Sequence, residues 1–275
     1  DHDPIIHVPI GWGRILLKRL HDWDYFFEPE PHLDNRAVEC ARGKVIGGSS
    51  SINAMAYVRC HPLDFDRWAK NGCTGWSFAD MLPYFQRQEN WEGGADAYRG
   101  QGGPLTTTRN RYPDPLVDAW IEAGAEAGYG FTEDYNGAET DGFCIMQSTV
   151  RRGLRCSASV AYLRPAMKRP NLVVSEKSLV LEIVMEGTRA VGIKYSHRGQ
   201  TYTAYAANEI VLCGGVINSP QVLMLSGIGA ADELAEHGID CKVDLPNVGK
   251  NLQDHLSVGI EYERKEDGPF VGVLR

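Results

Sequence analysis

The sequence predicts an α/β fold with a small antiparallel meander inserted in it. Two observations predict this class. From Asn171 onward, apolar or alternating segments of strand length are separated by glycine-containing turns. Strand-like and helix-like segments then alternate, as they do where helices cover a sheet. The chain has 275 residues, of which 43% are hydrophobic and 23% charged, so it can bury a sizeable core.

Two helices are predicted in the first half of the chain. In the stretch 77–86 apolar residues recur at helical spacing, and Ser77 and Asp80 form a capping pair at its start. A second helix begins near Leu116, and Gly128 closes it.

Three strands are predicted after Asn171, in the segments NLVVSEKSLVLEIVMEG, RAVGIKYSHRG and QTYTAYAANEIVLCGG. Within the third segment we expect a buried strand at Ile210–Cys213, ending in Gly214 and Gly215. Open α/β sheets bind ligands where a strand ends in such a turn before a helix. A plain crossover with a glycine turn is the alternative.

The next helix is expected to begin at Ser219-Pro220, with serine as the N-cap and proline as the first helical residue. A short helix, ADELAEHG, follows and ends at Gly238.

Charge and cysteine content exclude several function classes. The formal net charge of −8 argues against a nucleic-acid partner, which needs clustered Lys and Arg. No apolar run approaches the roughly 18 residues of a membrane span. The seven cysteines are odd in number and form no Cys-x-x-Cys, so we expect neither a disulfide framework nor a metal site. These features favour a reducing compartment, the cytoplasm.

The segment RGKVIGGSSSIN, residues 42–53, is the first candidate for a binding site. Glycine permits positive φ and the close approach of a ligand to the backbone. Serine hydroxyls and bare amides form a donor-rich concavity suited to an anion. Taken alone, twelve such residues can equally be a surface turn.

Two stretches in this order, GKVIGGSSSIN and GGVINSPQVLMLSGIG, together resemble the signatures of the glucose–methanol–choline (GMC) oxidoreductases. DLPNVGKNLQDHL, VRCHPLDFDRWAKNGCTGWSFADMLPYF and SASVAYLRP are also similar to that family, so the resemblance spans essentially the whole chain. Two departures are visible. Cys60 stands where glycine is common, and Val216 stands where alanine is usual.

The resemblance implies part of a Rossmann-like FAD-binding domain interleaved with an α+β substrate domain, truncated at both ends. Residues 1–105 and 166–255 would be FAD-binding segments, the latter with the inserted meander. Residues 106–165 would begin the substrate domain, and 256–275 would begin its sheet. The family's opening G-x-G-x-x-G turn is missing, since GWGRIL at Gly11–Leu16 lacks the third glycine. We therefore expect a piece of a longer protein, with the remaining part as its partner.

FAD is the implied cofactor, bound without a covalent link. Some relatives attach FAD through a histidine just before the equivalent of Asn53, and Ile52 stands at that position here. Ser49, Ser50 and Asn53 would offer donors, and Asn53 to Met55 would run beside the isoalloxazine ring. The implied cofactor contacts are Gly43, Gly47, Gly48, Ser49, Ile52, Asn53, Ala54, Met55, Val180, Gly214 and Gly215.

The implied activity is oxidation of the CH–OH group of a small-molecule alcohol, with proton abstraction and hydride transfer to flavin N5. No histidine here matches the family's catalytic base, and His255 belongs to a different motif, so no catalytic residue is named. Two alternatives stay open. One is a hydroxynitrile lyase-type member that keeps FAD without redox turnover. The other is a catalytically inactive fragment or structural partner.

Overall fold

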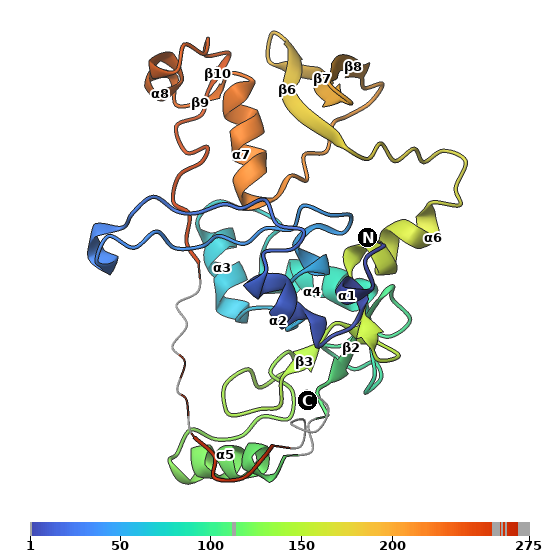
Figure 1. Ribbon diagram of the computed structural model, residues 1–275, viewed down its shortest axis with the longest axis vertical. Coiled ribbons are helices and arrows are strands. Elements are labelled where there is room, and N and C mark those ends of the chain that lie inside the picture. Colours follow the sequence, from blue (N-terminus) through green and yellow to red (C-terminus); the bar gives the residue numbers. More distant parts are fainter. Residues whose placement is uncertain (1, 112–113, 255–258, 260, 262, 269–275) are drawn as a thin grey trace. The chain divides into compact units, whose positions relative to one another are not determined.

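The computed structural model describes residues 2–111, 114–254, 259, 261 and 263–268, and the chain divides into two compact units (Figure 1). The first unit comprises Asp1–Leu172 with Arg264–Arg275, and the second comprises Val173–Glu263. The predicted mixture of helices and strands is confirmed. Among the described residues, no helix is both long enough and apolar enough to cross a membrane.

The first unit opens with two short helices, α1 (Pro4–His7) and α2 (Gly11–Leu17). The chain then makes a long excursion whose two limbs meet through isolated antiparallel bridges, with the 3-10 helix η1 (Pro31–Leu33) near its tip. A second 3-10 helix, η2 (Gly48–Ser51), follows the excursion. A small apolar core of Ile6, Ile15 and Ile52 joins α1 and α2 to the residue just after η2.

Helices α3 (Pro62–Lys70) and α4 (Phe78–Gln88) pack together through aromatic rings around Phe65. The helix predicted at 77–86 is confirmed as α4. Its capping box is complete, because the Ser77 hydroxyl accepts from the Asp80 amide while the Asp80 side chain accepts from the Ser77 amide.

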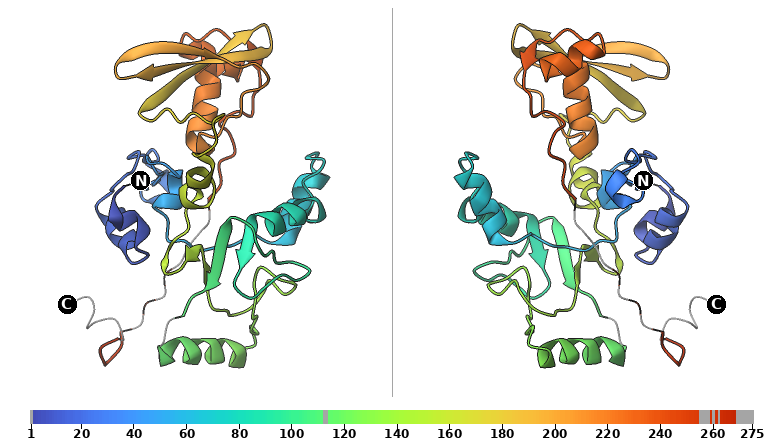
Figure 2. Two further views of the ribbon diagram at one scale, coloured as in Figure 1. Left: turned by 90° about the vertical axis from the view of Figure 1, so that its right-hand side faces the viewer. Right: turned by 90° about the vertical axis from the view of Figure 1, so that its left-hand side faces the viewer.

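A three-stranded sheet follows in the order β1 (Glu89–Trp91), β2 (Leu105–Arg109) and β3 (Gln147–Ser148). The second predicted helix is confirmed as α5 (Pro115–Glu126), which Figure 2 shows in green beyond the end of β2. A hairpin of β4 (Val150–Arg151) and β5 (Leu154–Arg155) leads into the π-helical turn η3 (Ser159–Leu163) and α6 (Arg164–Ala166).

The second unit contains the predicted antiparallel meander, β6 (Ser178–Glu186), β7 (Arg189–His197) and β8 (Gln200–Tyr205), paired in sequence order. Helix α7 (Gly215–Leu225) packs against β6, where the Ile183 amide donates to the Ser226 hydroxyl at 2.7 Å. The predicted helix at ADELAEHG is confirmed as α8 (Ala231–Glu236). Strands β9 (Ile228–Gly229) and β10 (Val243–Asp244) pair in parallel beside it.

Two predictions in this unit are wrong. Residues 210–213 do not form a strand, and the Val211 side chain is 72% exposed. No described strand pairs with this segment, and a strand without a ladder partner leaves its backbone groups unpaired. The next helix begins at Gly215 rather than at Ser219-Pro220, so Pro220 lies inside α7.

The reason for the second error is local. A Ser-Pro pair is typical of a helix start, but the backbone turns into α7 earlier, at Gly215 with φ +84°. Proline then removes one helical donor without ending the helix. The sheet predicted to begin in 256–275 lies largely outside the described residues.

Candidate functional site

The glycine–serine loop, residues 42–53, turns at two glycines with left-handed backbone, Gly47 (φ +93°) and Gly48 (φ +56°). Their surroundings differ. A Cβ added at Gly47 would lie 2.4 Å from the Ser51 hydroxyl oxygen, whereas one added at Gly48 would meet nothing within 4 Å. Gly47 therefore faces the interior of the loop, and Gly48 presents bare backbone to open space.

The serine hydroxyls hold the loop together. The Ser50 hydroxyl donates to the Gly47 carbonyl at 2.6 Å and accepts from the Ala158 amide at 2.9 Å. The buried Ser51 hydroxyl donates to the Ile46 carbonyl at 2.9 Å. In this structure the Ser50 hydroxyl proton is therefore committed within the loop. Ser49, in contrast, is exposed.

Two of the predicted contact residues support the loop from behind. A Cβ added at Gly43 would lie 2.4 Å from the Gly48 carbonyl oxygen and 2.8 Å from the Ser49 nitrogen, so Gly43 lets two backbone segments touch. The Ile52 side chain is 2% exposed and belongs to the Ile6–Ile15 core. Ile52 can therefore meet a ligand only through its backbone.

The Asn53–Met55 turn, which continues the loop, combines exposed and buried residues. Asn53 and Ala54 are exposed, while Met55 is 4% exposed and has φ +64°. A non-glycine residue in this left-handed region costs about 1–2 kcal/mol. The Asn53 Oδ1 accepts from the Met55 amide at 3.1 Å, and the Thr149 amide donates to the Met55 carbonyl at 2.9 Å. Surrounding contacts thus hold a strained turn at the candidate site.

Arg155 is the residue that sequence reasoning missed. Its side chain is 1% exposed, and its Nε donates to the Ile6 carbonyl at 2.7 Å. Its Nη1 lies 2.7 Å from the Asn53 carbonyl oxygen, 2.8 Å from Asn53 Oδ1 and 3.2 Å from the Ser50 carbonyl oxygen. Among the described residues its Nη2 is buried without a hydrogen-bond partner. Burial lowers the pKa of Arg155 to about 10, so the group is still charged at neutral pH.

No local signal in the sequence marks Arg155, because its partners are 102 to 149 residues away. The neighbouring stretch SASVAYLRP, which begins two residues later, was the available pointer. It carried the family resemblance without indicating a role for the arginine before it.

The remaining predicted contacts lie in the second unit. Val180 is in β6 beside an irregularity of register between Val180 and Glu182. Gly214 precedes α7 and Gly215 is its first residue, with open space at the position of an added Cβ. The structure thus brings together the candidates from Gly43 to Met55 in one loop, and it places the other three on a different unit.

Three histidines that the sequence left without a catalytic role have structural partners. His61 caps α3 by accepting from the Leu63 amide at 3.1 Å. His21 lies 3.0 Å from Asp3, and this hydrogen bond lowers the pKa of that carboxyl. His197 lies 3.0 Å from the Ser178 hydroxyl. His255 is outside the described residues.

A second buried polar cluster surrounds Glu89, which is fully buried at the start of β1. Its two carboxylate oxygens accept from Arg59 at 2.5 Å and from Arg99 at 2.6 Å. Arg99 also pairs with Asp134 at 2.7 Å, and Thr107 donates to Glu89 at 2.7 Å. We call these five residues the Glu89 network.

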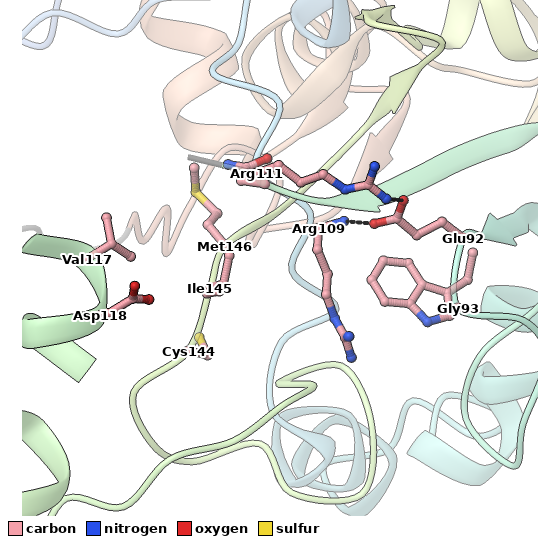
Figure 3. Close-up of a pocket in the computed structure, with 11 residues that line it drawn as sticks. Glu92, Gly93, Arg109, Arg111, Val117, Asp118, Cys144, Ile145 and Met146 are labelled. Atoms are coloured by element: carbon pink, nitrogen blue, oxygen red, sulfur yellow. Dashed lines mark hydrogen bonds and ion pairs between the residues drawn. The ribbon is translucent and has the colours of Figure 1, made fainter. Parts of the chain in front are cut away.

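A cavity of about 650 Å³ opens elsewhere in the first unit (Figure 3). Glu92 in its lining accepts from the Arg109 backbone amide at 2.6 Å and pairs with the Arg111 guanidinium at 3.0 Å. None of its lining residues belongs to the glycine–serine loop. This cavity is therefore separate from the predicted cofactor contacts.

Comparison with known proteins places this geometry in a family. The profile of the GMC oxidoreductases matches residues 19–257. The chain is 48% identical over 263 residues to an oxygen-dependent choline dehydrogenase of Brucella anthropi, covering 96% of this chain and 48% of that protein. The same holds over 264 residues for the enzyme of Brucella ovis. The chain thus spans about half the length of these curated relatives.

Solved structures of two oxidases are also similar to this chain. Pyridoxine 4-oxidase from Mesorbium loti superposes with a TM-score of 0.83 at 36% identity, over 90% of this chain and 49% of that one. A formate oxidase superposes with the same TM-score at 26% identity, over 92% of this chain and 46% of that one.

Proposed function

Because this chain belongs to the GMC oxidoreductase family, we propose that the protein carrying it is an FAD-dependent oxidoreductase of alcohols. The observation that carries the proposal is the glycine–serine loop, whose bare backbone at Gly48 adjoins the exposed Asn53 and Ala54. A flat aromatic ring and a pyrophosphate both require such close approach to backbone.

The residues present fit FAD. Nothing lies within 4 Å of an added Cβ at Gly48, and a buried donor, Arg155 Nη2, stands unpaired behind the loop. When bound, FAD supplies the electron sink for oxidation of a CH–OH group. The chain's part is to hold and orient it. The proposed flavin and pyrophosphate contacts are Gly47, Gly48, Ser49, Asn53, Ala54 and Met55, with the backbone of Ile52 and with Gly43 supporting them; Val180, Gly214 and Gly215 are proposed for the nucleotide.

FAD is bound without a covalent link in this proposal. Ile52 stands where a linking histidine would be, and its side chain is a buried hydrocarbon in the core. Acid precipitation of the full-length protein should release all yellow colour into the supernatant. Flavin retained in the protein pellet would contradict this assignment.

The substrate class is a small-molecule primary alcohol. Support comes from the names of relatives, a choline dehydrogenase and a pyridoxine 4-oxidase, both of which act on alcohols. The test is anaerobic addition of an alcohol panel, choline and pyridoxine included, to the full-length holoprotein. Bleaching of the oxidised flavin band by at least one alcohol is expected. A flavoprotein that no alcohol bleaches would overturn the oxidoreductase proposal.

The proposed domain partition follows the family. Residues 1–105 and 166–255 belong to the FAD-binding domain, while 106–165 and 256–275 belong to the substrate domain. The other half of the family's fold completes the site as this segment's partner. The cytoplasm is the proposed compartment, supported by seven cysteines that are all free thiols.

A further inference from the structure

Arg155 is a buried cation surrounded by neutral oxygens. Its four acceptors are the carbonyls of Ile6, Ser50 and Asn53 and the side-chain oxygen of Asn53. No described carboxylate forms an ion pair with it. Burying a charge without a counter-charge is expensive, and even a buried ion pair can often be replaced by well-packed hydrophobic residues without loss of stability. A purely structural role is therefore a poor explanation for an arginine here.

The acceptors themselves indicate the role. Three of the four belong to residues 50–53, the end of the glycine–serine loop, and the fourth belongs to α1. Arginine's rigid planar fork can bridge several acceptors at once, which a lysine ammonium on its flexible stem cannot do equally well. Arg155 thus connects the loop to α1 through hydrogen bonds to the loop backbone and to the Asn53 side chain.

The side chain of Asn53 links Arg155 to the strained turn. Its Oδ1 accepts from Arg155 Nη1 at 2.8 Å and from the Met55 amide at 3.1 Å. Arg155 therefore fixes the rotamer that holds the left-handed Met55. Without the guanidinium, the Asn53 side chain can rotate away and Met55 can relax from φ +64°.

We propose that Arg155 is a positioning residue, which locks the Asn53–Met55 turn in the conformation that receives the flavin. The proposal rests on the proposed function, since it assigns how the loop of that same site is held. Arg155 acts through Asn53 and the loop backbone.

The test is a matched pair of buried substitutions, Arg155→Lys and Arg99→Lys, in the full-length protein. Each substitution retains the positive charge and removes the planar guanidinium group. Arg155→Lys should raise the Kd for FAD at least about tenfold, because one lost charge-assisted hydrogen bond is worth about 1.5–3 kcal/mol. It should also change the visible circular dichroism of the bound flavin. Arg99→Lys should lower the apoprotein Tm while leaving the Kd and the flavin spectrum unchanged.

Hydrogen exchange of the apoprotein gives a readout that needs no cofactor. The Met55 amide should exchange faster in Arg155→Lys than in the wild type, and at the wild-type rate in Arg99→Lys. Arg155→Gln removes the buried charge and retains amide donors, so it provides a second variant with the same expected results should Arg155→Lys not fold.

The outcomes separate the two proposals. A wild-type protein that binds no FAD sinks the proposed function. A wild type that binds FAD, with an unchanged Kd, flavin spectrum and Met55 exchange in both Arg155 variants, sinks only the positioning role. Equal increases in Kd for Arg155→Lys and Arg99→Lys would likewise show a general effect of stability.

Discussion

Arg99 and Arg155 are both 1% exposed, yet one is surrounded by carboxylates and the other by amide oxygens. For Arg99, burial acts to lower the pKa, but the hydrogen bond and charge of Glu89, with the charge of Asp134, outweigh it and raise the pKa. For Arg155, burial alone acts and the pKa falls. The same side chain is thus electrostatically satisfied in one place and left with excess positive charge in the other.

The difference fits a structural role for Arg99 and the positioning role that we propose for Arg155. The Glu89 network is closed, since its charges neutralise one another within the sheet and its flanking segments. At Arg155 a donor and a charge remain uncompensated beside the candidate cofactor loop. Proteins tend to violate the rules of polar satisfaction at functional sites.

The largest expected effect concerns the closed region. Glu89→Gln removes the counter-charge shared by Arg59 and Arg99 and should lower the free energy of unfolding by about 3–5 kcal/mol, because both arginines stay buried. Denaturant unfolding measures the loss. Asp64→Asn, in the exposed pair with Arg67, is the matched control and should cost no more than about 1 kcal/mol. Similar losses of unfolding free energy in Glu89→Gln and Asp64→Asn would contradict the distinction between the buried Glu89 network and the exposed ion pair.

The next prediction sharpens the comparison within the glycine–serine loop. Gly47→Ala should destabilise the protein by about 2–4 kcal/mol, since it adds a clash with Ser51 to the left-handed strain. Gly48→Ala meets open space and should cost only the strain, about 1–2 kcal/mol. Chemical denaturation of the apoprotein measures both.

FAD binding should rank these two variants differently from the way the free energy of unfolding ranks them. Gly48→Ala places a methyl group on the open face and should weaken FAD binding more than its stability loss explains. Normal FAD occupancy in Gly48→Ala would favour a surface turn over a cofactor loop.

The smallest expected effect lies next to the network. Cys60 has φ +66°, a left-handed backbone that favours glycine, which is the residue that the family resemblance leads us to expect at this position. Cys60→Gly should raise the free energy of unfolding by about 0.5–1 kcal/mol, the relief of strain less the entropy that glycine adds to the unfolded chain. Cys60→Ala keeps the Cβ and should give no gain. An equal gain from alanine would assign the effect to the sulfur atom.

Local rules made part of this structure predictable. The capping box at Ser77 and Asp80 and the alternating strands of the meander depend on residues close in sequence, and both are confirmed. The start of α7 depends on a backbone turn at Gly215, which a typical Ser-Pro signal four residues later concealed. Residues 210–213 are apolar but form no strand, because apolar composition alone does not provide a neighbouring strand to pair with.

The candidate site also has one part that the sequence predicts and another that depends on contacts between distant residues. Paired glycines and a family signature located the loop, and the structure adds that Gly43 and Ile52 lie behind it rather than on its open face. Arg155 and the left-handed Met55 could not be anticipated, because both depend on contacts with residues about a hundred positions away.

The hydrogen bond between Arg155 and the Ile6 carbonyl spans 149 residues, and this span has a consequence for the order of folding. Contacts of such separation form late, because a long stretch of chain must be closed before they contribute. A ribosome adding 5–20 residues per second needs roughly 7–30 s to bridge that interval. The glycine–serine loop therefore leaves the ribosome well before Arg155 has been synthesised. The meander, in contrast, can pair as soon as its neighbouring strands are made. During synthesis the glycine–serine loop waits for β5, and in our proposal FAD binding would follow the arrival of Arg155.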